Sequence, residues 1–222
     1  MDMMEIRRRV LSSNNGIPFS FEEKEYIKAL SLGSYFDTGK IIEKGSVISI
    51  TFYAEVVNTS VAGPCLFGWR TQSSTNKHIM LLSRTSDNSG RIVIGVAGSS
   101  TGQLHAYTNN VKTTVTIDTN TKNIYVDGTV VNGLTCNFDN AFDQFGSSVI
   151  APTLLAMSEL SGSTINRTNS AIGSKIYNYK VTKNGKSLID LRPCIRKSDN
   201  TVGMFDIINR RFMTGTGSYE TN

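Results

Sequence analysis

Apolar and polar residues alternate strictly between Val47 and Val57, and this pattern limits the fold more than any other feature of the chain. The apolar set shares one face and comprises Ile48, Ile50, Phe52, Ala54 and Val56. The other face carries Ser49, Thr51, Tyr53 and Glu55. Successive side chains of a β-strand point to opposite faces, so this segment is predicted to be a half-buried strand of an antiparallel sheet.

Further strands are expected before and after this one. Residues 111–118 alternate in the same way, and Asp127-Gly128 and Asn184-Gly185 are dipeptides that favour tight hairpin turns. Other predicted strands cover residues 66–70, 79–83, 91–97, 123–126, 129–131 and 154–160, with a loop over 84–90. About a dozen strands and at most one or two short helices are expected, as in a sandwich or barrel.

The last fifty residues predict how the domain closes. Strands are expected over 175–181 and 188–196, on either side of the Asn184-Gly185 turn, and then over 202–206 and 211–217. Short turns between consecutive strands make them antiparallel neighbours. We therefore predict an all-β chain, with a two-sheet antiparallel sandwich over residues 23–222.

Residues 1–22 are predicted to form an N-terminal arm. Met3–Leu11 could make a short helix, which the polar run over 12–16 would end. Arg7, Arg8 and Arg9 form the one dense basic run in a chain of net charge +5. Nucleic-acid binding needs positive charge concentrated over a whole face, so we interpret the arginines as a segment that docks on a partner protein.

The three cysteines, Cys65, Cys136 and Cys194, are widely spaced. This spacing matches no zinc motif and no disulfide framework, so we expect buried, reduced thiols and no metal site. Residues 1–10 are charged and no apolar segment follows, so no signal peptide is predicted. The sequence also lacks an apolar run of the length that membrane insertion needs.

Both ends of the chain resemble a known domain family. Near the N-terminus, Tyr26-Ile27 and Tyr35-Phe36-Asp37-Thr38-Gly39 follow a pattern Y-I-x-S-x-G-x-Q-Y-I-D-T-G, with Ser34 in place of the Gln. Residues 171–217 follow K-I-Y-x-x-K-I-x-x-N-G-x-L-x-x-D-x-x-P-C-x-R-K-S-D-x-x-x-G-M-x-D and its tail. On these motifs the chain resembles the concanavalin A-like, laminin-G-type jelly-roll domains of phage and prophage virion proteins from gut bacteria. Together the ends bracket about 190 residues, and between them only the strand alternation matches.

The resemblance implies a non-enzymatic structural protein of a phage particle, in a tail fibre, a baseplate or a capsid decoration. It also implies an exposed place on the virion, other virion proteins as partners and a homo-oligomer, with a trimer favoured. The sandwich could contact host-surface polysaccharide or serve as a spacer without a ligand. A bacterial lectin-like carbohydrate-binding module is the alternative, and a glycoside hydrolase is the third.

A hydrolase of this fold needs two carboxylates closely spaced on one strand. Glu22, Glu23 and Glu25 lie together before the core strands, and Asp139 and Asp143 lie in a predicted loop, so we interpret both groups as solvated. His78 and His105 have no recognisable nucleophile beside them, and no catalytic residues are predicted.

No cofactor is predicted either. Calcium is possible at Asp87-Asn88, Asp139-Asn140 or Asp199-Asn200, although these pairs match no known calcium loop and favour turns for their own hydrogen bonds.

Exposed aromatic rings beside polar groups would suit a glycan. The candidates are Trp69 with Arg70, and Tyr107 with His105. Trp69 sits in an apolar run and is more simply a core residue, whereas Tyr107 is expected near a strand end and is the better exposed candidate. A second group, Asp190, Arg196, Asp199 and Asp206, is interpreted as a structural motif that fixes the closing turns through charge-assisted hydrogen bonds.

Overall fold

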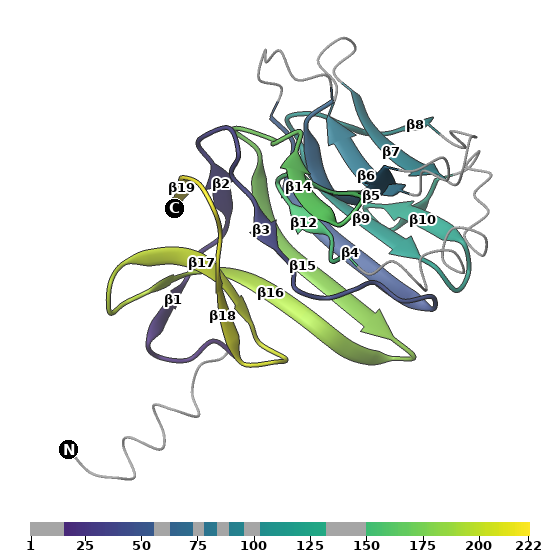
Figure 1. Cartoon of the computed structure of the whole chain (residues 1–222). Coiled ribbons are helices and arrows are strands. Elements are labelled where there is room, and N and C mark those ends of the chain that lie inside the picture. Colours follow the sequence, from purple (N-terminus) through teal and green to yellow (C-terminus); the bar gives the residue numbers. More distant parts are fainter. Residues whose placement is uncertain (1–15, 56–62, 73–77, 84–88, 96–102, 132–149) are drawn as a thin grey trace.

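The computed structural model describes residues 16–55, 63–72, 78–83, 89–95, 103–131 and 150–222. These residues form 19 β-strands and no helix. The strands make two sheets that lie against each other (Figure 1). The predicted all-β class and its arrangement as two largely antiparallel sheets are confirmed.

The larger sheet has 11 strands, in the order β11-β10-β9-β4-β15-β16-β17-β18, with β1 beside β16, β2 beside β15 and β19 beside β2. All its described pairs are antiparallel. Its strands are β1 (Phe21–Glu23), β2 (Ile27–Ala29), β4 (Ser46–Tyr53), β9 (Lys112–Asp118), β10 (Asn123–Val126), β11 (Thr129–Val130), β15 (Lys175–Lys183), β16 (Lys186–Arg196), β17 (Thr201–Asp206), β18 (Arg211–Thr214) and β19 (Tyr219–Thr221).

The smaller sheet has eight strands, in the order β14-β13-β5-β6-β7-β8, with β12 joining β3 to β5. Its strands are β3 (Phe36–Asp37), β5 (Cys65–Gln72), β6 (His78–Ser83), β7 (Ser89–Gly95), β8 (Gln103–Thr108), β12 (Thr153–Leu154), β13 (Met157–Ser161) and β14 (Thr164–Thr168). The β13–β5 pair is parallel and the other described pairs are antiparallel.

The strongest alternation predicted the sheet faces correctly. In β4 the even-numbered residues 46–52 are buried and the odd-numbered residues 47–53 are half-buried. Strand β9 shows the same pattern, although Val111 lies just before it and is 49% exposed. Both predicted hairpin turns have positive φ at each central residue, with 48° and 81° at Asp127-Gly128 and 51° and 74° at Asn184-Gly185. These values match the turn that Asn-Gly and Asp-Gly favour, because only such residues adopt them readily.

The single strand predicted over residues 154–160 is wrong. Thr153 and Leu154 pair antiparallel with β5, whereas Ser158 to Ser161 pair with it in parallel. The chain reverses between them at Leu155, whose φ is 64° and whose side chain is fully buried. A leucine in the left-handed region is uncommon, so the apolar run gives no turn signal in the sequence.

Aromatic rings connect the two sheets in the main core. Phe67 of β5 lies 5.6 Å from Tyr179 of β15, and Phe52 of β4 lies 4.9 Å from Tyr107 of β8, between ring centroids. All four side chains are at most 7% exposed. Burial of such rings is among the largest single contributions to a core, because each removes a large apolar area from water.

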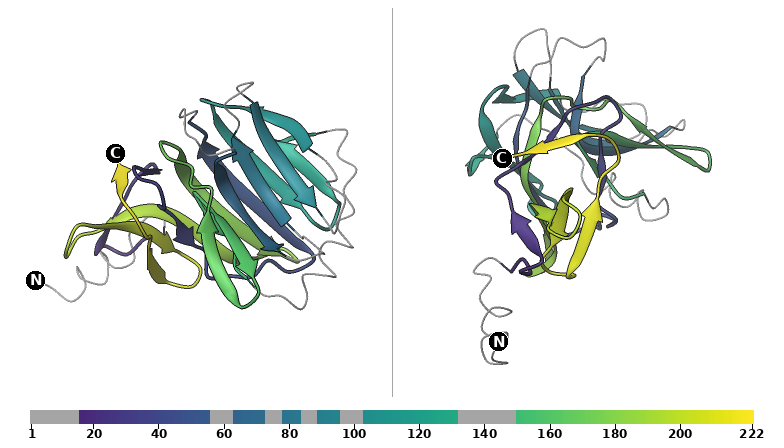
Figure 2. Two further views of the ribbon diagram at one scale, coloured as in Figure 1. Left: turned by 45° about the horizontal axis from the view of Figure 1, so that its top comes forward. Right: turned by 90° about the vertical axis from the view of Figure 1, so that its left-hand side faces the viewer.

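A second, smaller core lies away from the sandwich. The long strand β16 extends past the main core (Figure 2). There β1 and β17 pair with β16, and β18 pairs with β17. There Ile17, Cys194 and Phe205 are buried, and the ring of Phe21 lies 4.9 Å from Phe205 and 5.0 Å from Phe212.

The predicted arm is described only in part. Its helix over 3–11 and the docking residues Arg7, Arg8 and Arg9 lie outside the described residues. Ile17 belongs to the second core and Phe21 begins β1, so the last residues of the arm are part of the folded body.

Gly203 of β17 permits this second core to close. A Cβ atom there would lie 2.5 Å from the backbone oxygen of Met213 and equally close to the Phe212 ring. We therefore expect Gly203→Ala to destabilise the protein by about 1–3 kcal/mol, the usual cost of overpacking. Thr214→Ala, at the exposed position that pairs with Gly203, should change stability by less than about 0.5 kcal/mol. Urea denaturation of the two variants measures the difference, and equal midpoints would contradict the packing argument.

Candidate functional site

The two aromatic residues predicted to bind glycan are buried. Trp69 is 3% exposed and packs edge-on against Phe67, with ring centroids 6.0 Å apart. Tyr107 is 7% exposed, so its predicted exposure is wrong. The cause is Gly90, since a Cβ at that position would lie 1.7 Å from the Tyr107 ring. The ring occupies the space that Gly90 leaves, and its burial raises the pKa of Tyr107 well above the ordinary value.

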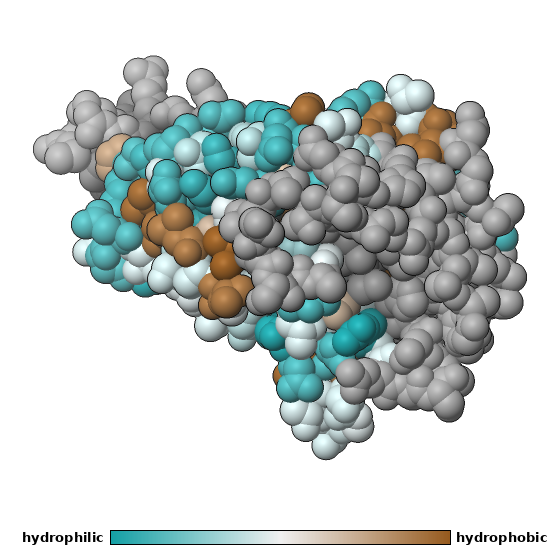
Figure 3. All heavy atoms as spheres, turned by 90° about the horizontal axis from the view of Figure 1, so that it is seen from above, coloured by the Kyte–Doolittle hydropathy of each residue, from teal (hydrophilic) through white to brown (hydrophobic). Residues whose placement is uncertain are grey.

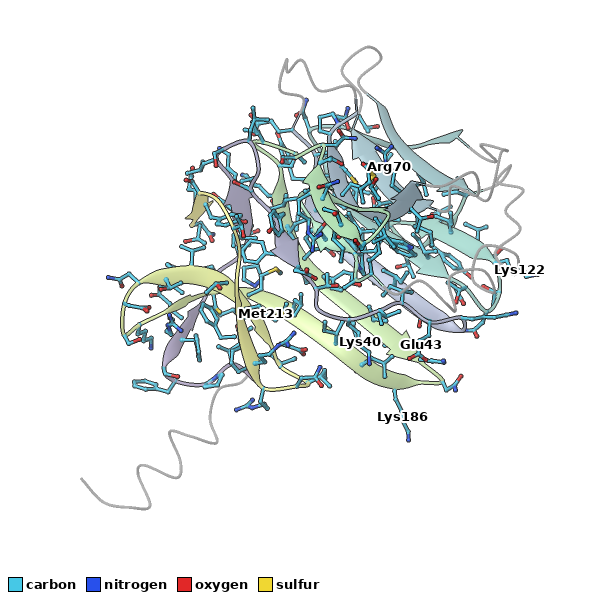
Figure 4. All side chains as sticks on the ribbon, in the orientation of Figure 1. Lys40, Glu43, Arg70, Lys122, Lys186 and Met213 are labelled. Atoms are coloured by element: carbon cyan, nitrogen blue, oxygen red, sulfur yellow. The ribbon has the colours of Figure 1, made fainter. Side chains whose placement is uncertain are left out.

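The polar members of that predicted site are not brought together by the described structure. Arg70, which Figure 4 labels, forms an ion pair with Glu159, its neighbour across the β5–β13 pair. Glu159 is only 3% exposed, so the pair neutralises a carboxylate in the interior of the sheet. The backbone of His105 lies in β8, and its side chain is outside the described part.

The four residues predicted as a structural motif form two groups, Arg196 with Asp199 and Asp190 with Asp206. Arg196 holds Asp199 through its Nε and Nη2 atoms, at 3.0 and 2.6 Å, within the turn that joins β16 to β17. This bond and that from Thr201 lower the pKa of Asp199. Asp190 instead pairs with Arg192, at 2.7 Å, which raises the pKa of the Arg192 guanidinium.

Asp206 fixes the turn between β17 and β18. Its Oδ1 atom accepts hydrogen bonds from the backbone N–H groups of Asp190, Ile208 and Asn209, at 3.3, 3.1 and 3.2 Å. Its Oδ2 atom accepts one from the Asn209 side chain at 2.6 Å. The carboxylate is 1% exposed, and these four donors compensate its burial.

Most other described carboxylates also hold cations or turns. Glu22 is bound by Lys24 at 2.8 Å, which lowers its pKa, and Glu25 is bound by Lys112 at 3.2 Å. Asp139, Asp143, Asp87-Asn88 and Asp139-Asn140 lie outside the described residues. Within the described part, no group of three or more His, Cys, Asp or Glu residues is placed to hold a metal ion.

A different group of aromatic residues faces solvent on the larger sheet. Tyr26, Tyr53 and Tyr177 are half-buried, and two lysines lie over their rings. Lys112 Nζ is 3.9 Å from the Tyr177 centroid, and Lys175 Nζ is 4.2 Å from Tyr26 and 5.3 Å from Tyr53. The Tyr26 and Tyr177 rings meet edge to face at 5.9 Å. We call these five residues the tyrosine–lysine surface.

A β-bulge places Tyr177 in this surface. Ile176 pairs with Phe52 of β4, but Asn178 pairs with Thr51, so Tyr177 is an extra residue with no partner opposite it in β4. Ile176 and Tyr179 are buried, whereas Tyr177 and Asn178 are both half-buried on the outer side. Bulges of this kind redirect a side chain, and they are common beside binding sites.

The Lys175 ammonium group and the Tyr177 phenol of this surface can each bind a ligand. Lys175 has no carboxylate partner among the described residues, and its two contacts are with tyrosine rings. Each exposed cation–π contact contributes only about 0.5–1 kcal/mol, so the ammonium group can turn toward a bound oxygen at little cost. Partial burial and then the nearby Glu25 raise the pKa of Tyr177, which keeps its phenol protonated and able to donate a hydrogen bond.

Hydroxyl groups continue the same outer face. The Thr51 and Thr114 hydroxyl oxygens are 3.0 Å apart across β4 and β9, and Thr116 donates to Ser49 at 3.2 Å. Ring edges, ammonium groups and hydroxyls thus lie on one surface, and this combination can bind a ligand with both C–H and oxygen-rich parts.

Sequence reasoning missed this surface although part of its signal was present. Tyr53 belongs to the polar set of the first predicted strand, so its outward direction could have been inferred. The bulge could not be inferred, because a regular alternation from Ile176 turns Tyr177 outward and Asn178 inward, whereas both are half-buried on the outer side.

Comparison with known proteins leaves the chain without an assigned family. No protein-family model matches it, and no curated protein matches it. Within the described residues, no helix has the length and apolar character needed to cross a membrane.

Two of the cysteines are buried free thiols in strands, as expected. Cys65 lies in β5 and Cys194 in β16, and burial raises the pKa of each thiol to about 12. Only about one thiol in ten thousand is then ionised at pH 8, and the thiolate is the reactive form. Cys136 lies outside the described residues.

A Cys136→Ser variant tests this burial. We expect it to show almost no reaction with Ellman's reagent at pH 8 in the native state, and two equivalents in 8 M urea (about the concentration that unfolds most domains). Rapid reaction of either thiol in the native protein would show that the strand carrying it is accessible.

Proposed function

We propose that this chain is a non-enzymatic structural protein of a phage particle whose sandwich, a concanavalin A-like jelly roll, contacts host-surface polysaccharide. A tail fibre, a baseplate or a capsid decoration is the expected place, with other virion proteins as partners and a homo-oligomer, most simply a trimer. The motifs at both chain ends support the family, and the two packed antiparallel sheets agree with it.

The tyrosine–lysine surface is the observation that carries the binding part of this proposal. Tyrosine is well suited to such contacts because its ring is rigid, presents an apolar edge and ends in a hydroxyl. On the face seen in Figure 3 the coloured residues are mostly hydrophilic, with apolar residues in small separate groups. The tyrosine–lysine surface presents ammonium groups beside hydroxyls, which suit a polar, oxygen-rich ligand such as a polysaccharide.

The two other functions have weaker support. A glycoside hydrolase needs two carboxylates free to act on a bond, whereas Asp190, Asp199 and Asp206 are held by arginines or by backbone N–H groups. A bacterial lectin-like module would use the same tyrosine–lysine surface. It differs from a virion protein only in that it would not be part of a phage particle.

Tyr177→Ala tests the binding surface. We expect affinity for the cognate host polysaccharide, measured by biolayer interferometry on immobilised glycan, to fall at least tenfold, since about 1.4 kcal/mol is lost with a central aromatic contact. Tyr125→Ala removes a half-buried tyrosine from β10, outside the surface, and should change affinity less than twofold. Equal losses in the two variants would refute the assignment of the surface.

The virion assignment has its own measurement. Quantitative mass spectrometry of purified particles should find the chain at a fixed copy number per particle, in a multiple of three, five or six, because closed symmetric assemblies are the rule for such oligomers. If the protein is absent from particles but binds glycan through the tyrosine–lysine surface, the lectin-like module replaces the virion protein.

A further inference from the structure

A groove separate from the tyrosine–lysine surface lies where three distant segments meet. It is lined by the loop Thr38–Lys40, by Leu188 and Ile189 of β16, and by Asp206, Asn209 and Arg211 around the β17–β18 turn. Its volume is about 240 Å³. Pockets for drug-sized ligands measure about 300–1,000 Å³, so this groove suits a group no larger than one sugar unit.

The groove contains two cations whose nearest acids are already engaged. Arg211 is opposite Asp206 in the β17–β18 register, a position where an ion pair would be expected. Asp206 instead accepts its four hydrogen bonds from backbone and amide donors. Likewise Glu43, near Lys40, is bound by Lys183 at 2.6 Å. Within the described chain, neither Arg211 nor Lys40 has a carboxylate partner, and the one hydrogen-bond acceptor of the Arg211 guanidinium is the weak acceptor Met213 Sδ, at 3.6 Å.

The loop that lines the groove lets the guanidinium approach its backbone closely. A Cβ atom on Gly39 would lie 2.7 Å from Arg211 Nη2, so the glycine lets the arginine lie close against the loop. The φ of Gly39 is 63°, which glycine adopts without strain. Leu188 of β16, which also lines the groove, is an extra residue with no partner in β15, because Val181 pairs with Ile189 and Thr182 with Ser187.

We propose that this groove is an anion-binding site that takes the carboxylate of one acidic sugar unit or a comparable small carboxylate. Arg211 binds the carboxylate oxygens through two parallel N–H groups, the geometry that guanidinium groups favour. Lys40, in the loop beside Gly39, adds a second positive charge, and Leu188 provides an apolar contact for the ring that carries the acid. The site is independent of the proposed virion role and of the tyrosine–lysine surface.

Titration with sodium glucuronate, followed by amide chemical shifts in ¹⁵N-labelled full-length protein, tests the proposal. We expect saturable shifts at Gly39, Arg211 and their neighbours, and at least tenfold weaker binding of methyl glucoside, which lacks the charge. Arg211→Gln should weaken glucuronate binding at least tenfold without lowering the melting temperature, because its side chain is exposed and makes no ion pair among the described residues.

Lys186→Gln is the matched control. Lys186 is exposed at the end of the β15–β16 hairpin and points away from the body, whereas Lys40 lies along it (Figure 4). The control removes the same charge as Arg211→Gln, and glucuronate affinity should change less than twofold.

Three results decide between the possibilities. Equal binding in Arg211→Gln and Lys186→Gln, or shifts confined to other parts of the protein, would overturn the site. Acetate or inorganic phosphate that binds as tightly as glucuronate would support an anion site that recognises the charge alone. Tighter binding of glucuronate than of both would identify the acidic sugar as the ligand. Since Tyr177→Ala leaves this groove intact, its outcome and that of Arg211→Gln are separable.

Discussion

The contact between Phe67 and Tyr179 is the interaction on which the rest of the molecule depends. It joins β5 of one sheet to β15 of the other, and both rings are fully buried. Tyr179 pairs with Ile50 of β4 on one side and Leu191 of β16 on the other, so its inward direction fixes three central strands of the larger sheet. Because side chains alternate along a strand, an inward Tyr179 also requires its neighbours Asn178 and Lys180 to face outward. The outer surface is therefore specified by the core behind it.

Several aspartates in this fold stabilise places where the chain changes direction. Asp206 and Asp199 each bind backbone N–H groups of a turn between C-terminal strands, and Asp118 does the same after β9. The pKa of Asp118 is lowered, because the bonds from the turn residues outweigh the effect of its partial burial. A carboxylate committed to a turn in this way is a poor general acid, which is why acidic residues near a sequence motif do not by themselves indicate an enzyme.

The sequence predicted what depends on periodicity and on local turn chemistry. The faces of β4 and β9 and the turns at Asp127 and Asn184 follow from two-residue alternation and from residues that adopt positive φ easily. It could not predict features that depend on a distant partner. The reversal at Leu155 is stabilised by backbone bonds to Leu66 and Ala171, and the burial of Tyr107 depends on the missing Cβ of Gly90. None of these three partners is close in sequence to the residue that it contacts, so no local pattern encodes the contacts.

Both candidate sites lie beside irregularities in the pairing of strand β15 with its two neighbours. Strand β15 loses register with β4 at Tyr177 and with β16 next to Val181, where the extra residues are Tyr177 and Leu188 respectively. Tyr177 and Val181 are four residues apart, or about 13 Å along an extended strand. A regular strand would turn alternate side chains toward the core and leave no extra residue for a ligand. A bulge removes that constraint at a single position while the flanking pairs, Ile176 with Phe52 and Val181 with Ile189, keep the sheet intact. Strand β15 can thus stabilise the centre of the sandwich while one irregularity supplies Tyr177 from β15 and the other supplies Leu188 from β16, which is a physical reason to look for function at both places.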